Sequence, residues 1–141
     1  MKLEHDDIKA NMRIKLMGLW IIYILLTIYS SLNIFYQTGH INDIISGFIG
    51  STAISQSILM FQDIFMIITL LPIFVISFLN NIKIIKLTNI VVGIICIVLK
   101  DVMGIIDDYS WVFNKVNGSI GIIIILSIII ISIKWKKEGS I

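Results

Sequence analysis

The sequence predicts an all-α membrane protein, a four-helix transmembrane bundle that forms a single domain over residues 1–141. Three observations predict it: four apolar runs long enough to cross a bilayer, basic residues gathered on one side of those runs, and few charges elsewhere. Hydrophobic residues make up 57% of the chain and charged residues only 14%, where a soluble domain usually carries about 25%. The mean hydropathy of +1.00 agrees, and the net charge of +2 is too small to suggest a nucleic-acid partner.

The four apolar runs cover residues 16–36, 54–79, 84–106 and 118–135. Each reaches the roughly 17–25 residues that a helix needs to cross about 30 Å of hydrocarbon. None shows the alternation of every second residue that a barrel strand requires, so helices are the predicted spanning elements. The first run is too long for a secretory signal and no small-residue cleavage site follows it, so we expect it to stay as an uncleaved helix.

The basic residues predict the orientation. If the chain crosses four times, nine lysine and arginine residues flank the runs on one side, and only Lys115 lies in a loop on the other. The positive-inside rule makes the nine-residue side, and with it both termini, cytoplasmic in the cell membrane. Aromatic residues at the run ends are interpreted as interfacial anchors: Tyr36, Tyr109, Trp111 and Phe113 outside, and Trp20 and Trp135 inside.

The first outer loop, residues 37–53, is longer than a connection needs. Its apolar residues follow the i, i+3, i+4, i+7, i+8 spacing of a short helix lying in the membrane interface, over residues 41–49. Such a helix would either pack over the mouth of the bundle or act as a lid. The apolar residues are Ile41, Ile44, Ile45, Phe48 and Ile49.

Polar and charged residues interrupt the second and third runs, as Gln62 with Asp63 and Lys100 with Asp101. An ionisable group inside a membrane costs about 2.5–3.5 kcal/mol on insertion scales, so it usually faces the bundle interior and finds a partner. Asp63 and Lys100 each lie 16 residues from the cytoplasmic end of their run, a depth of about 24 Å at 1.5 Å per residue. We therefore predict an Asp63–Lys100 ion pair. Pro72 is expected to kink the second run.

Two stripes of polar and small residues accompany these charges. In the third run, an i, i+4, i+7, i+11 stripe predicts an inward face, and in the first run a second polar stripe reaches the same depth. The fourth run offers only small residues and serines, so it is expected to be a packing or lipid-facing helix. The stripes are Asn89, Gly93, Cys96 and Lys100, and Tyr29, Asn33 and Tyr36.

The sequence thus predicts a polar pocket that opens outwards and is lined by Asn33, Gln62, Asp63, Lys100 and Asp101. Two interpretations stay open. The charges form a structural pair, or lysine snorkels to the interface; alternatively, the pocket binds an ion or a small solute.

Familiar catalytic chemistry is absent from the sequence. It contains no His-x-x-Glu-His, Cys-x-x-Cys, phosphate-binding glycine loop or nucleophile elbow. The histidines, His5 and His40, lie outside the runs, so a haem held by paired histidines within the bundle is excluded. The lone Cys96 is interpreted as a buried packing residue. We therefore predict no enzyme activity, no catalytic residue, no metal site and no cofactor.

Two segments carry a family resemblance: Lys15-Leu16-Met17-Gly18-Leu19-Trp20, and Leu71-Pro72-Ile73 followed by a basic turn and Thr88-Asn89-Ile90-Val91-Val92-Gly93-Ile94. Together they resemble an uncharacterised family of small bacterial four-helix membrane proteins, itself more distantly similar to the DoxX-like membrane proteins. The resemblance covers nearly the whole chain. It implies a bundle in a prokaryotic inner membrane and no established activity. Family members often carry an acidic residue late in the first helix, where this chain has Ser30, Ser31 and Asn33.

Four functions are weighed. The first is a non-enzymatic membrane protein with an ion or solute site, transporter-like or an accessory subunit. The second is a structural subunit that binds a membrane-protein partner or a copy of itself. A dimeric proton-coupled multidrug exporter is third, disfavoured because the first run has no carboxylate. A redox-enzyme subunit is fourth, disfavoured by the lack of haem and thiol ligands.

Overall fold

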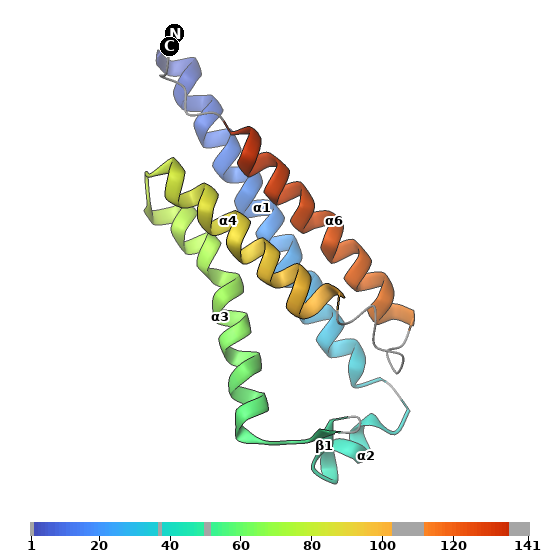
Figure 1. Cartoon of the computed structure of the whole chain (residues 1–141). Helices are drawn as coiled ribbons and strands as arrows, with labels where there is room; N and C mark the ends of the chain where they lie inside the picture. Colours follow the sequence, from blue (N-terminus) through green and yellow to red (C-terminus); the bar gives the residue numbers. More distant parts are fainter. Residues whose placement is uncertain (1, 37, 50–51, 103–111, 136–141) are drawn as a thin grey trace.

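The protein is all-helical apart from one short hairpin, as the sequence predicts (Figure 1). The computed structural model describes residues 2–36, 38–49, 52–102 and 112–135. The long helices are α1 (Lys2–Ile34), α3 (Gln56–Phe78), α4 (Ile82–Cys96) with its π-helical continuation η1 (Ile97–Val102), and α6 (Val112–Lys134). Between α1 and α3 lie the short helix α2 (His40–Ile45) and the antiparallel strands β1 (Phe48–Ile49) and β2 (Thr52–Ala53).

Within the described ranges, four segments are long and apolar enough to cross a membrane: Met12–Asn33, Leu59–Phe78, Ile82–Val102 and Val112–Lys134. Only 22–28% of the most apolar window of each segment is buried inside the protein. A water-soluble protein rarely exposes contiguous apolar patches of more than a few hundred Å². The outer surface of this bundle is therefore suited to hydrocarbon.

The long helices form one bundle (Figure 1). Helix α6 packs against α1 and α4, and α3 packs against α4 and α1. The first residues of α1, the last residues of α6 and the α3–α4 turn lie at one end of the bundle, and α2 lies beyond the other end (Figure 1). We call these the basic end and the α2 end.

The fourth helix begins earlier than predicted. Helix α6 starts at Val112, and its first turns contain the polar residues Asn114, Lys115 and Asn117. The prediction began at residue 118 because it relied on the apolar run, which starts only after these residues. Residues 103–106 of the predicted third run, and the predicted anchors Tyr109 and Trp111, lie outside the described residues.

The inward stripe of α1 differs from the predicted one. Its buried residues, Leu16, Trp20, Tyr23 and Thr27, follow the i, i+4, i+7, i+11 spacing. Tyr29 and Tyr36, from the predicted stripe, are 59% and 86% exposed. The polar residues of α1 that form hydrogen bonds with η1, Tyr23 and Thr27, therefore lie on a different face of the helix from Tyr29.

Trp20 and Trp135 are buried within the protein, so their interpretation as interfacial anchors is wrong. They are 0% and 5% exposed. The Trp20 indole N–H donates a hydrogen bond to Oδ1 of Asn89 on α4, whose Nδ2 donates to the Ile85 carbonyl at 2.7 Å. Trp20 lies inside because α4 supplies the acceptor that its indole needs.

Helix α6 is a packing member of the bundle. Its buried residues include two glycines, and a Cβ added at Gly93 on α4 would lie 3.1 Å from Cγ2 of Ile125. The small residues thus let α4 and α6 approach closely. The buried residues of α6 are Gly118, Gly121, Ile125, Ile128 and Ser132.

Helix α3 bends along its length, so that its amino-terminal half diverges from the bundle (Figure 1). The buried Pro72 lies inside this helix. Proline removes one backbone hydrogen bond and its ring crowds the carbonyl of residue i−4, here Ile68, which kinks a helix. Thr69 donates to the Met66 carbonyl at 2.7 Å, a local bond that also favours bending.

The helix of the first loop is shorter than the predicted 41–49. It ends after Ile45, and Gly47 follows with a φ of +86° that favours glycine. The chain then enters the hairpin at Phe48 instead of continuing the helix.

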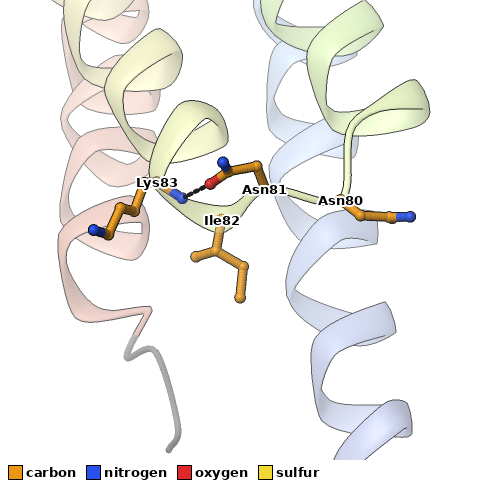
Figure 2. Close-up of a pocket in the computed structure, with 4 residues that line it drawn as sticks. All are labelled: Asn80, Asn81, Ile82 and Lys83. Carbon is orange, nitrogen blue, oxygen red and sulfur yellow. Dashed lines mark hydrogen bonds between the residues drawn. The ribbon is translucent and has the colours of Figure 1, made fainter. Parts of the chain in front are cut away.

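The α3–α4 turn is fixed by its own side chains (Figure 2). Asn81 caps α4 by accepting a hydrogen bond from the Lys83 backbone N–H at 3.0 Å, and Arg13 on α1 donates to Oδ1 of Asn80 at 3.2 Å. A hollow of about 340 Å³ here is lined only by the four consecutive residues Asn80 to Lys83. No other helix in the described part of the chain contributes to it, so it brings no side chains together from different elements.

Candidate functional site

The π-helical turn η1 determines which charged residue faces inwards. The predicted stripe of α4 is buried as far as Cys96. An α-helical step of four residues would continue it to Lys100, but a π-helix has i→i+5 spacing. The stripe therefore continues to Asp101, which is 1% exposed, while Lys100 is only partly buried.

The Asp101 carboxylate lies among three helices. Tyr23 on α1 donates its hydroxyl to Oδ2 at 3.2 Å, and Lys100 Nζ lies 3.8 Å from Oδ1. On α6, a Cβ added at Gly121 would lie 2.7 Å from Oδ1, so the carboxylate occupies the space that the glycine leaves. Among the described residues Oδ1 accepts no hydrogen bond, and Lys100 supplies its neutralising charge.

The Lys100 ammonium is held by α1 as well as by Asp101. Its Nζ donates to Oγ1 of Thr27 at 2.8 Å and lies 5.1 Å from the centre of the Tyr23 ring, within cation–π range. The side chain is 28% exposed. Lys100 therefore bridges the protein interior and an open space beside α1.

The predicted Asp63–Lys100 ion pair does not form. The ammonium group of Lys100 pairs with Asp101 instead, because this buried carboxylate is adjacent in the chain and needs a neutralising charge. Asp63 lies on the diverging half of α3 and is exposed. No hydrogen bond or ion pair reaches its carboxylate from any residue that the structure describes.

Asp63 and Lys100 nevertheless line the same cavity, as their predicted equal depth suggests. This cavity, of about 870 Å³, lies between α1, the diverging half of α3, η1 and α2. We call it the α3 cavity. Its polar lining consists of Thr27, Ser31, His40, Ser57, Gln62, Asp63 and Lys100.

The rest of the α3 cavity is apolar and partly aromatic. Phe35, which directly follows α1, and Phe61 and Phe65 on α3 contribute to its walls. Phe35 also makes an edge contact with His40 at a centroid distance of 6.2 Å. Ligand pockets are typically 300–1,000 Å³, mostly apolar, with a few polar groups that fix orientation. The α3 cavity has this size and this lining.

The structure brings together three of the five predicted pocket residues. Gln62, Asp63 and Lys100 line the cavity. Asp101 supports Lys100 from behind, towards α6, and the half-buried Asn33 is not part of the lining. Among the described part of the chain, no three His, Cys, Asp or Glu side chains come close enough to hold a metal ion.

Sequence reasoning missed several polar residues of the site. Tyr23, Thr27 and Ser31 recur at i, i+4, i+8 on one face of α1, a signal present in the sequence. His40 and Ser57 gave no such signal, because they reach the cavity only through the path of the first loop.

These features define an all-helical protein with four helices suited to a membrane and one amphipathic cavity. Comparison with family models, with curated protein sequences and with solved structures finds no match. The similarity to small bacterial four-helix proteins and DoxX-like proteins therefore stays a prediction.

The ion pair can be tested by double-mutant cycles. Lys100→Met should lower the free energy of unfolding by up to about 3–5 kcal/mol, because it leaves a buried carboxylate without its cation. Adding Asp101→Asn should recover part of this loss. Adding Asp63→Asn should instead leave the loss unchanged to within about 0.5 kcal/mol, because Asp63 is not paired with Lys100. Denaturant unfolding in mixed micelles measures each step. Coupling of Lys100 to Asp63 but not to Asp101 would contradict the pairing described.

The space at Gly121 provides a second test. Gly121→Ala should destabilise the protein by about 1–3 kcal/mol, because the added methyl group overlaps the Asp101 carboxylate. Gly18→Ala is the matched control: no atom lies within 4 Å of its added Cβ, so it should gain about 0.5–1 kcal/mol from helix propensity. Equal unfolding free energies for the two variants would show that α6 does not confine Asp101.

Proposed function

We propose that this chain is a bacterial integral membrane protein with four transmembrane helices and both termini in the cytoplasm, and that it binds a small solute in the α3 cavity. Its role is binding, as a transporter-like protein or an accessory subunit, and not catalysis. The observation that carries the proposal is that Asp63, which has no partner among the described residues, lines the same largely apolar cavity as Lys100.

The membrane placement is supported by the character of the two bundle ends. The basic end holds Arg13, Lys15, Lys83, Lys86 and Lys134. Lys86 Nζ donates to the Ile133 carbonyl in the last turn of α6 at 3.4 Å, where a cation offsets the negative end of the helix dipole. The positive-inside rule assigns this end to the cytoplasm, so the α2 end with the cavity faces outwards.

The solute site is supported by the cost of its charges. Ionisable side chains within spanning segments are rare and commonly mark ion or substrate paths. Lys100 is accounted for by its contacts with Asp101 and Thr27. Asp63 makes no such contact with any described residue. A purely structural bundle would gain stability if an apolar residue replaced Asp63.

Orientation is tested by labelling single cysteines in a Cys96→Ser background. Ser57→Cys, in the α3 cavity, should react with a membrane-impermeant maleimide added to intact cells. Lys134→Cys, exposed at the basic end, should react only after the membrane is opened. The reverse pattern would invert the proposed orientation, and reaction of both in intact cells would contradict four crossings.

Binding is tested by filling the cavity. Ser31→Trp places a large side chain in the α3 cavity, and Leu25→Trp is its matched control on an exposed part of α1 outside the lining. Protein in lipid nanodiscs is heated with tetraphenylphosphonium, tetraphenylborate, choline, benzoate or indole. At least one probe should raise the Tm of the wild type and of Leu25→Trp but not the Tm of Ser31→Trp. At a probe concentration of a hundred times its Kd, the stabilisation should be about 2.7 kcal/mol.

Equal stabilisation of the Ser31→Trp variant would place binding outside the cavity. A wild type that none of these probes stabilises would favour a structural or partner-binding subunit instead.

A further inference from the structure

The charges that line the α3 cavity are not balanced. Lys100 is the only lysine or arginine in the described lining, and Asp101 already neutralises it at 3.8 Å. Asp63 adds a second carboxylate, which receives no partner from the described residues. His40 contributes an imidazole ring to the same lining. Among Lys100, Asp101 and Asp63, one negative charge is therefore left over, and it belongs to the cavity lining on α3.

An anion is poorly matched to this arrangement. To bind one, Lys100 would have to leave Asp101, which has no other cation among the described residues, and Thr27. Breaking such a buried pair is strongly unfavourable. The anion would also share the cavity with the uncompensated charge of Asp63, which repels it.

A metal ion is also poorly matched. Hard cations take six or more oxygen ligands, but Asp63 is the only carboxylate in the described lining, and no three potential ligands of the acid, thiol or imidazole type gather in the described chain. The large apolar wall would be left without a role.

A cation with an apolar body satisfies both the charge and the walls. Its charge would balance Asp63. Its body would lie against Phe61 and Phe65, which come from the same helix as Asp63, and against Phe35, which directly follows α1. Aromatic faces attract organic cations, by about 2 kcal/mol or more where water is excluded. The cavity volume of about 870 Å³ accommodates a molecule of several rings.

We infer that the solute of the α3 cavity is a monovalent lipophilic organic cation, an ammonium or phosphonium compound whose charge pairs with Asp63. This rests on the proposed function and names its ligand class. Lys100 and Asp101 form the positioning pair behind the site, which keeps the second charged group of the cavity neutralised and leaves Asp63 free.

The test compares two probes of nearly equal shape and opposite charge, tetraphenylphosphonium and tetraphenylborate. Their binding to the full-length protein in phosphatidylcholine nanodiscs is measured by equilibrium dialysis, with protein-free nanodiscs subtracted. The wild type should bind the phosphonium at least tenfold more tightly than the borate. Triphenylphosphine oxide, an uncharged relative, should bind as weakly as the borate.

The variant Asp63→Asn should weaken phosphonium binding at least tenfold. This substitution keeps the shape of the side chain and breaks no bond within the described structure, so its Tm should match that of the wild type. Asp43→Asn is the matched control, since Asp43 is an exposed carboxylate on α2 outside the cavity lining. It removes the same charge and should leave the affinity unchanged.

Three results would overturn the inference: wild-type protein that does not bind the phosphonium, equal affinity for phosphonium and borate, or equal phosphonium affinity in Asp63→Asn and Asp43→Asn. None of these alone removes the proposed solute site. That proposal fails separately, when no probe distinguishes the wild type from the filled cavity of Ser31→Trp.

Discussion

A carboxylate that is removed from water has to be neutralised and hydrogen-bonded nearby, and Asp101 meets this requirement on two helices and its own. Lys100 supplies the charge, Tyr23 on α1 supplies the hydrogen bond, and Gly121 on α6 supplies the space. These contacts fix α1, η1 and α6 relative to one another. Since Lys100 is also bonded to Thr27, the outward side of this network forms a wall of the α3 cavity.

Helix α3 takes no part in the Asp101 network, and this explains its different course. Its carboxyl-terminal half is held by the short turn to α4 and by Asn80, which binds Arg13. Its amino-terminal half, which precedes Pro72 in the chain, diverges from the bundle (Figure 1). An Asp63–Lys100 pair would have drawn the helices together and closed the space between them. The bend of α3 and the pairing of Lys100 with Asp101 therefore both leave this space open.

The sequence predicts the parts of this fold that depend on local composition. Four apolar helices follow from run length, and the buried stripe of α4 follows from spacing. The Lys100–Asp101 pairing could not be predicted, because a π-helical turn shifts the buried stripe of α4 by one residue. No glycine or proline in residues 97–102 signals this turn. Likewise, Trp20 is buried because of an acceptor on Asn89, 69 residues away. Non-local partners of this kind are invisible to a rule about residue type and membrane depth.

Two departures from regular helix geometry border the α3 cavity from different sides. One is the π-helical turn that carries Lys100, and the other is the bend of α3 that carries Asp63 away from it. At Pro72 the bent helix gives up a backbone hydrogen bond that a straight α-helix would keep, which is costly in hydrocarbon because no water replaces the lost bond. The π-helical turn replaces i→i+4 hydrogen bonds by the rarer i→i+5 bonds. A bundle selected only for packing would lose nothing by straightening both helices and pairing its charges. Both irregularities meet at one amphipathic cavity, and one carboxylate there has no partner among the described residues. This is the physical reason why the proposed binding site is centred on Asp63 and not on the buried Asp101.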